Sequence, residues 1–151
     1  MVQSGKYSVA LRNVTDDTLL CTAQYHLRRY TRAAVPDPVP TEIKLRSRSR
    51  VLAVAFDDGH TFELPFEYLR VYSPSAEVKG HGPGQEVLVL GKENVGIRAV
   101  EQVGQYAVKL VFDDGHDTGL FSWKYLYELG HDREQKWAHY LQRKRQAAQP
   151  R

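Results

Sequence analysis

Histidines in turn-like segments are the residues of this chain whose type and spacing could do chemistry. They are His60, His81, His116 and His131. Two of them end a repeated pentapeptide, Phe-Asp-Asp-Gly-His, at residues 56–60 and 112–116. Neutral imidazoles that converge from loops can hold zinc, copper or iron. A histidine that follows Asp-Gly more often forms hydrogen bonds with nearby carbonyl or carboxylate groups. We therefore expect the two pentapeptides to be turns, and a metal site is the less favoured interpretation.

Signatures of common enzymes are missing from the chain. There is no phosphate-binding loop, no dinucleotide fingerprint, no Gly-x-Ser-x-Gly elbow and no His-x-Asp or His-x-Glu pair. The single cysteine, Cys21, excludes an intramolecular disulfide and a cysteine cage for a metal. The sequence therefore predicts a protein that is not an enzyme and has no cofactor. The alternative is an enzyme that uses His116 as general base with Asp114 or Asp117 orienting it.

Composition and charge narrow the class further. The chain has 151 residues, 42% of them hydrophobic and 26% charged, which is ordinary for one globular domain. Without a signal peptide or an apolar run of about 18 residues, it is expected to be cytoplasmic with no membrane partner. Basic residues outnumber acidic ones six to two in residues 131–151 but not in residues 41–130, where the ratio is ten to thirteen. Nucleic-acid binding through such a basic end is the least favoured function.

The elements that must position these histidines follow from periodicity and turn signals. Strands are expected at 42–46, 51–56, 61–64, 95–100 and 106–112, with a strand-like run at 87–90. Asp-Gly between apolar runs predicts hairpins, because Gly accepts the positive φ of a tight turn. Short helices are expected over 65–70 and after Ser122, and a longer one from Asp132 to Gln146. The fold class is α+β, an antiparallel sheet of hairpins with short helices and a C-terminal helix.

Three parts of the chain are expected. Residues 1–40 read as a disordered or extended appendage with a short helix within 22–34, ended by the prolines of residues 36–40. Residues 41–130 form the domain, and residues 131–151 add the terminal helix and a basic tail. Inside the domain, residues 73–85 are rich in Gly and Pro and are expected to lack regular structure.

The binding surface is expected where the two turns meet the loop of residues 80–85, since loops on a rigid sheet carry function. Its predicted residues are His81, Gly82, Gly84, Asp114, His116 and Trp123. His81 and His116 are the candidate contacts with a partner or metal, and zinc or iron is the metal that would suit them. Trp123 and Tyr125 are expected to support the turn from beneath.

Several stretches together resemble a known family, the N-terminal domain of γ-butyrobetaine hydroxylase. The resemblance covers about residues 41–130 and lies in Leu69-Arg70 and in residues 73–77, 80–85 and 112–126. It implies a small stand-alone bacterial protein of unknown biochemical role. Relatives are fused to iron–sulfur cluster carrier ATPases of the Mrp type, or to the oxygenase domain of γ-butyrobetaine and trimethyllysine hydroxylases.

In the hydroxylases, the resemblance implies a structural zinc held by three cysteines and one histidine. Carried onto this chain, the cysteine positions fall on Ser73, Ser75 and Val78, and the histidine falls on His116. Only the histidine can bind zinc well, so a hydroxylase-type zinc site is predicted to be absent.

These considerations predict a non-catalytic binding or adaptor module linked to iron–sulfur cluster assembly or metal handling. The expected partner is a protein, with an iron–sulfur cluster carrier ATPase as the candidate that the resemblance suggests. A self-associating structural module is the remaining alternative, because the related domain of the hydroxylases contributes to dimers. The sequence therefore leaves a homodimer open.

Overall fold

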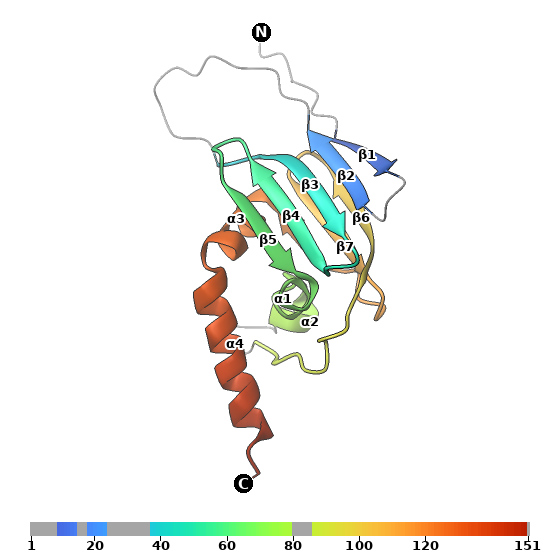
Figure 1. Cartoon of the computed structure of the whole chain (residues 1–151). Coiled ribbons are helices and arrows are strands. Elements are labelled where there is room, and N and C mark those ends of the chain that lie inside the picture. Colours follow the sequence, from blue (N-terminus) through green and yellow to red (C-terminus); the bar gives the residue numbers. More distant parts are fainter. Residues whose placement is uncertain (1–8, 15–17, 24–36, 80–85, 151) are drawn as a thin grey trace.

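The computed structural model describes residues 9–14, 18–23, 37–79 and 86–150. Within these residues, eight strands form two antiparallel sheets (Figure 1). The larger sheet has the order β1 (Val9–Val14), β2 (Thr18–Ala23), β3 (Pro40–Arg46), β4 (Val51–Phe56), β5 (Thr61–Pro65). The smaller sheet has the order β6 (Ile97–Val103), β7 (Ala107–Phe112), β8 (Leu120–Ser122). The helices are α1 (Phe66–Val71), α2 (Ala76–Lys79), α3 (Trp123–His131) and α4 (Arg133–Ala148).

The predicted α+β class and the meander of β3, β4 and β5 are confirmed. The structure adds β1 and β2 from the segment that was expected to be an appendage. β2 pairs with β3, so β3 is an inner strand whose backbone groups are paired on both sides. The helix expected within 22–34 is wrong at Thr22 and Ala23, which belong to β2, because strand pairing outweighs the weak helical tendency of a segment without an apolar stripe. Residues 24–34 lie outside the described residues.

Both repeated pentapeptides form the predicted hairpin turns. Gly59 and Gly115 have φ values of +90° and +88°, in the left-handed region that favours glycine. In each turn the backbone N–H of the phenylalanine donates to the carbonyl of the histidine, at 2.8 Å in the first copy and 2.9 Å in the second. The aspartate before each glycine accepts from the histidine N–H. The two copies therefore have the same local conformation.

The helices follow the predicted signals with two differences. Ser122 caps α3 as expected, since its Oγ accepts from Tyr125 N–H at 3.2 Å. Asp132 precedes α4, but its carboxylate accepts from His131 Nδ1 instead of capping the helix. The expectation of no regular structure across 73–85 is wrong at α2, because glycine and proline concentrate after it and the Ser75 carbonyl can accept from the N–H groups of its first turn. The strand-like run at 87–90 is not part of either sheet.

One hydrophobic core joins the two sheets. Its buried residues come mainly from β3, β4 and β5 in one sheet, from β6, β7 and β8 in the other, and from α1 and α3. Helix α3 lies along β5, and the Tyr68 hydroxyl of α1 donates to the Leu129 carbonyl of α3 at 2.8 Å. Helix α4 continues from α3 and extends beyond the sheets (Figure 1). None of the described helices is long and apolar enough to cross a membrane.

Candidate functional site

The second Asp-Asp-Gly-His turn lies against the connection between α1 and α2. His116 Nδ1 is 2.9 Å from Glu77 Oε2, and its Nε2 is 2.8 Å from Ser73 Oγ. A carboxylate can only accept, so in the neutral ring Nδ1 carries the proton and Nε2 accepts from the Ser73 hydroxyl. Both ring nitrogens are thus engaged by residues of one short segment. We call Ser73, Glu77 and His116 the histidine cluster.

Asp114 ties the same turn to two cations. Its Oδ2 lies 2.8 Å from Arg70 Nε and 2.6 Å from Lys92 Nζ, and its Oδ1 accepts from His116 N–H. Burial raises the pKa of Asp114, but the hydrogen bonds from Lys92, His116 N–H and Arg70 outweigh it and lower the pKa to about 2. The carboxylate is therefore charged throughout the physiological range and holds the turn against α1.

The first turn has the same sequence but a different environment. The side chain of His60 is 58% exposed, whereas that of His116 is 2% exposed. His60 Nδ1 contacts Asp58 of its own turn at 2.9 Å, and the Tyr127 hydroxyl also donates to Asp58. These contacts make His60 a surface turn residue, as the sequence predicts, while His116 is the histidine placed in a buried polar cluster.

The structure does not bring all the predicted site residues together. The first turn joins β4 to β5, whereas the second contacts α1, which begins at the opposite end of β5, so the two turns do not form one face. Trp123 is also elsewhere, because its indole N–H donates to Gln105 O in the turn between β6 and β7, at the other end of β7. Local sequence cannot show at which end of a sheet a turn will lie. Tyr125 does lie near the site, and its hydroxyl donates to Tyr72 O at 2.7 Å.

Three predicted residues, His81, Gly82 and Gly84, lie outside the described residues. His131 lies at the exposed end of α3 beside Asp132.

The residues at the implied zinc positions do not fit a zinc ion. His116 and Ser73 are in hydrogen-bond contact, and Ser75 and Val78, which follow Ser73 in the chain, are buried. Two hydroxyls, an isopropyl group and one imidazole are a poor donor set for zinc, which prefers thiolate and imidazole ligands. In the part of the chain that the structure describes, no three His, Cys, Asp or Glu side chains form a group that could hold a metal. The buried hydroxyl of Ser75 has no hydrogen-bond partner among the described residues.

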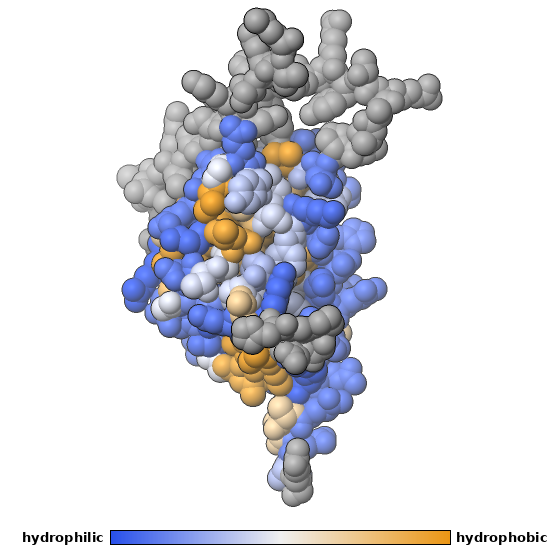
Figure 2. Space-filling view, turned by 180° about the vertical axis from the view of Figure 1, so that it is seen from behind, coloured by the Kyte–Doolittle hydropathy of each residue, from blue (hydrophilic) through white to orange (hydrophobic). Residues whose placement is uncertain are grey.

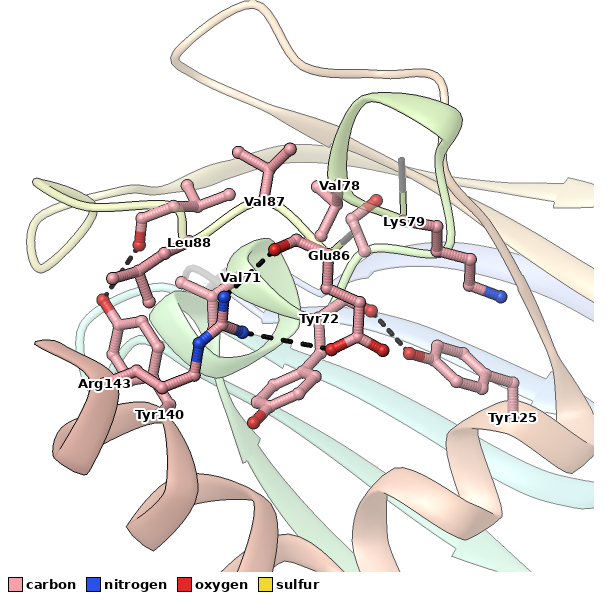
Figure 3. Close-up of a pocket in the computed structure, with 12 residues that line it drawn as sticks. Val71, Tyr72, Val78, Lys79, Glu86, Val87, Leu88, Tyr125, Tyr140 and Arg143 are labelled. Atoms are coloured by element: carbon pink, nitrogen blue, oxygen red, sulfur yellow. Dashed lines mark hydrogen bonds and ion pairs between the residues drawn. The ribbon is translucent and has the colours of Figure 1, made fainter. Parts of the chain in front are cut away.

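A small pocket opens beside the histidine cluster, between the α1–α2 connection, residues 86–89 and α4 (Figure 3). We call it the α4 pocket; its volume is about 60 Å³. Three tyrosines line the pocket, and the hydroxyl of each donates a hydrogen bond to a backbone carbonyl. Tyr72 donates to Lys136 O, Tyr125 to Tyr72 O and Tyr140 to Val89 O. Burial is the largest cause that raises the pKa of Tyr125 to about 12. These phenols are therefore neutral structural donors.

The segment of residues 86–90 carries exposed apolar side chains at the edge of the α4 pocket. Val87 is 51% exposed and Leu90 is 47% exposed. Figure 2 shows hydrophobic side chains gathered on this face, at the level where α4 extends from the body. Large apolar side chains grouped at a pocket are typical of an interaction site.

Sequence reasoning did not assign roles to Arg70, Glu77 and Lys92, which hold Asp114 and His116. Arg70 and Glu77 lie in stretches that carry the family resemblance, which was the available signal. Lys92 lies 22 residues before Asp114, and nothing in its local sequence indicates that pairing.

Comparisons with known proteins agree with this fold. The family model described as "Gamma-butyrobetaine hydroxylase-like, N-terminal" matches residues 43–127. Two proteins with NMR solution structures are 49% and 53% identical, cover 77% and 79% of this chain and 91% of their own chains, and superpose with TM-scores of 0.66 and 0.65.

A third solved structure is a crystal structure from Acidithiobacillus ferrooxidans ATCC 23270, described as a protein with unknown function of the DUF971 family. It is 46% identical, covers 60% of this chain and 91% of its own, and has a TM-score of 0.51. No curated protein matches the sequence. Since the family model covers more than half of the chain, this protein belongs to the γ-butyrobetaine hydroxylase-like N-terminal domain family.

Proposed function

We propose that this protein is a non-catalytic binding module that recognises a partner protein through the α4 pocket and residues 86–90. The observation that carries the proposal is the pair of exposed apolar side chains, Val87 and Leu90, beside a pocket on a rigid body. Burying such side chains against a partner is favourable, and aliphatic contacts around a pocket commonly anchor an interface. The histidine cluster supports this role by holding α2 onto the second turn.

The partner suggested by the family resemblance is an iron–sulfur cluster carrier ATPase of the Mrp type. Its support is the fusion of related domains to such carriers. The histidine cluster does not supply a metal site in the part of the chain that the structure describes, so the link to iron–sulfur metabolism that we propose is through protein binding.

Calorimetric titration of the purified chain with a purified Mrp-type carrier tests the proposed function. We expect saturable binding that weakens at least tenfold in the double variant Val87→Ser/Leu90→Ser. Leu120→Ser removes an apolar side chain of similar exposure on β8 and is the matched control. Unchanged binding in the double variant, or no binding to the carrier, would contradict the proposal.

A second candidate function is acyl-ester hydrolysis. It is favoured by the chain of hydrogen bonds that links Ser73 to His116 and His116 to Glu77. The arrangement of hydroxyl, imidazole and carboxylate is that of a nucleophile, base and orienting acid. In such a step Ser73 Oγ attacks an ester carbonyl, its proton passes to His116 Nε2, and His116 returns the proton to the leaving alcohol. Water then hydrolyses the acyl-enzyme.

Burial disfavours this second candidate. Ser73 is 1% exposed, and a Cβ placed on Gly119 would lie 2.1 Å from Ser73 Oγ, so the hydroxyl is covered by that backbone. Hydrolysis of p-nitrophenyl acetate by the chain and by Ser73→Ala separates the candidates. Equal rates leave the binding module as the function, whereas loss of a saturable rate in the variant would establish the hydrolase.

A further inference from the structure

The α4 pocket combines an apolar floor with a small volume. Val71, Val78 and Leu88 contribute aliphatic surface to it. A volume of about 60 Å³ corresponds to roughly two water molecules in the liquid. The branched end of one aliphatic side chain is of that size, so the pocket suits a single anchor residue better than a drug-sized ligand.

Two cations flank the pocket. Lys79 Nζ lies 5.2 Å from the centre of the Tyr125 ring, and no carboxylate of the described residues forms an ion pair with it. Arg143 Nη2 donates to the Glu86 carbonyl at 3.0 Å, and its Nη1 lies 4.0 Å from Glu86 Oε2, at the limit of an ion pair; Figure 3 shows both links between α4 and the 86–89 segment. The Glu86 side chain is 65% exposed, so the ion pair with its carboxylate is weak and can be exchanged for another carboxylate. The hydrogen bond to the Glu86 carbonyl keeps Arg143 beside the pocket.

The backbone beside the pocket also offers hydrogen-bond donors. Val87 N–H donates to Val78 O at 2.9 Å, which fixes the segment to α2. The N–H groups of Leu88 and Leu90 have no partner among the described residues. A peptide in extended conformation can accept from such groups, as in recognition by strand addition.

We propose that the α4 pocket and residues 86–90 bind an extended peptide segment in which one aliphatic side chain is flanked by acidic residues. The aliphatic side chain enters the pocket, the peptide carbonyls accept from the N–H groups of Leu88 and Leu90, and the acidic side chains pair with Lys79 and Arg143. Glu86 competes with the peptide for Arg143. This inference rests on the proposed binding function and names the chemistry of the partner.

Fluorescence anisotropy with a labelled peptide, Gly-Asp-Glu-Leu-Glu-Asp-Gly, tests the inference on the full chain. Lys79→Gln and Arg143→Gln are each expected to weaken binding at least threefold, and Val87→Ser by a similar factor. Glu86→Gln is expected to tighten binding, because it removes the carboxylate that competes with the peptide for Arg143 and leaves the backbone acceptor of Arg143 in place. Lys124→Gln, which neutralises an exposed lysine on α3, is the control for charge.

Peptide controls separate the two parts of the recognition. Replacing the acidic residues of the peptide by lysine, or its leucine by glycine, is expected to abolish saturable binding. Equal effects of Lys79→Gln and Lys124→Gln, or weaker binding in Glu86→Gln, would overturn the inference.

Failure of the inference can be told from failure of the proposed function. Binding of the carrier that depends on Val87 and Leu90, together with no binding of the acidic peptide, would overturn only the acidic and aliphatic character assigned to the partner. Sedimentation equilibrium of the chain alone tests whether a second copy of the chain, and not a peptide, covers this surface. A dimer that is lost in Val87→Ser/Leu90→Ser would show that a second copy covers the surface, and would overturn the peptide assignment.

Discussion

The hydrogen bond between Ser73 and His116 depends on the lack of a side chain at Gly119. A Cβ there would lie 2.1 Å from Ser73 Oγ and 3.3 Å from Pro74 Cδ. Only glycine lets the chain just before β8 approach the α1–α2 connection this closely. The need for glycine at this position arises from packing and not from a turn.

Gly119→Ala is therefore expected to destabilise the protein by about 1–3 kcal/mol, because the new methyl group displaces Ser73. Ser73→Ala alone is expected to cost about 1–2 kcal/mol, since it leaves His116 Nε2 buried without a donor. The double variant should cost less than the sum, because removing the hydroxyl relieves the worst contact. Urea denaturation of the four proteins measures this coupling, and strict additivity would contradict it.

Asp114 gives the fold a pH dependence at the acid end. Its pKa in the folded protein is about 2, below the ordinary value of 3.8. The charged form is favoured by folding, so its contribution is complete above about pH 4 and is lost as the pH falls through about 2. The side chain of Asp114 is 16% exposed, and with screening by solvent its contribution near neutral pH is about 1–2 kcal/mol.

Asp114→Asn is expected to lower the free energy of unfolding by about that amount near pH 7 and to flatten its fall between pH 4 and pH 2. Asp58→Asn is the matched change in the exposed first turn and is expected to have a smaller effect. Urea denaturation across this pH range checks the expectation. An equal loss of unfolding free energy in both variants would show that burial of the second turn adds nothing to the stabilisation by its aspartate.

At the level of elements, the two helix starts near the C-terminus differ in their caps. Ser122 Oγ accepts from Tyr125 N–H, whereas the Asp132 carboxylate is turned to His131 and makes no cap bond. Helix α4 instead depends on the packing of Trp137 and Tyr140 against the body.

Ser122→Ala is expected to cost about 1 kcal/mol, the usual loss of a capping hydroxyl. Asp132→Ala is expected to cost clearly less, because no cap bond is removed. Thermal unfolding followed by circular dichroism compares the two variants. A larger loss from Asp132→Ala would show that its charge at the start of α4 outweighs the cap at α3.

At the level of the whole molecule, one core spans both sheets. Leu52 of β4 and Leu110 of β7 are fully buried in the same cluster. A shared core of this kind makes the sheets unfold together.

Leu52→Ala and Leu110→Ala are each expected to destabilise the protein by about 2–5 kcal/mol while keeping a single transition. The exposed Leu90→Ala is the control and should change stability little. Calorimetry distinguishes the outcomes, because two separate transitions in either variant would mean that the sheets are independent units.

The sequence by itself determined the local features of this protein. The two hairpin turns follow from Gly59 and Gly115 and from aspartates that bond two residues along the chain. The cap at Ser122 lies within three residues of its partner. Such features are predictable because the chain brings these groups together at little entropic cost.

The family resemblance already distinguished His116 from His60, but only the tertiary structure showed which partners surround the second copy of the repeat. His116 meets Ser73 and Glu77 across 43 and 39 residues of sequence, and Asp114 meets Arg70 across 44. The identical first turn lacks these partners and stays at the surface. Burial of one turn and exposure of the other depend on which end of the sheets α1 and α2 occupy, and that placement is set by packing of the whole core and not by the five repeated residues.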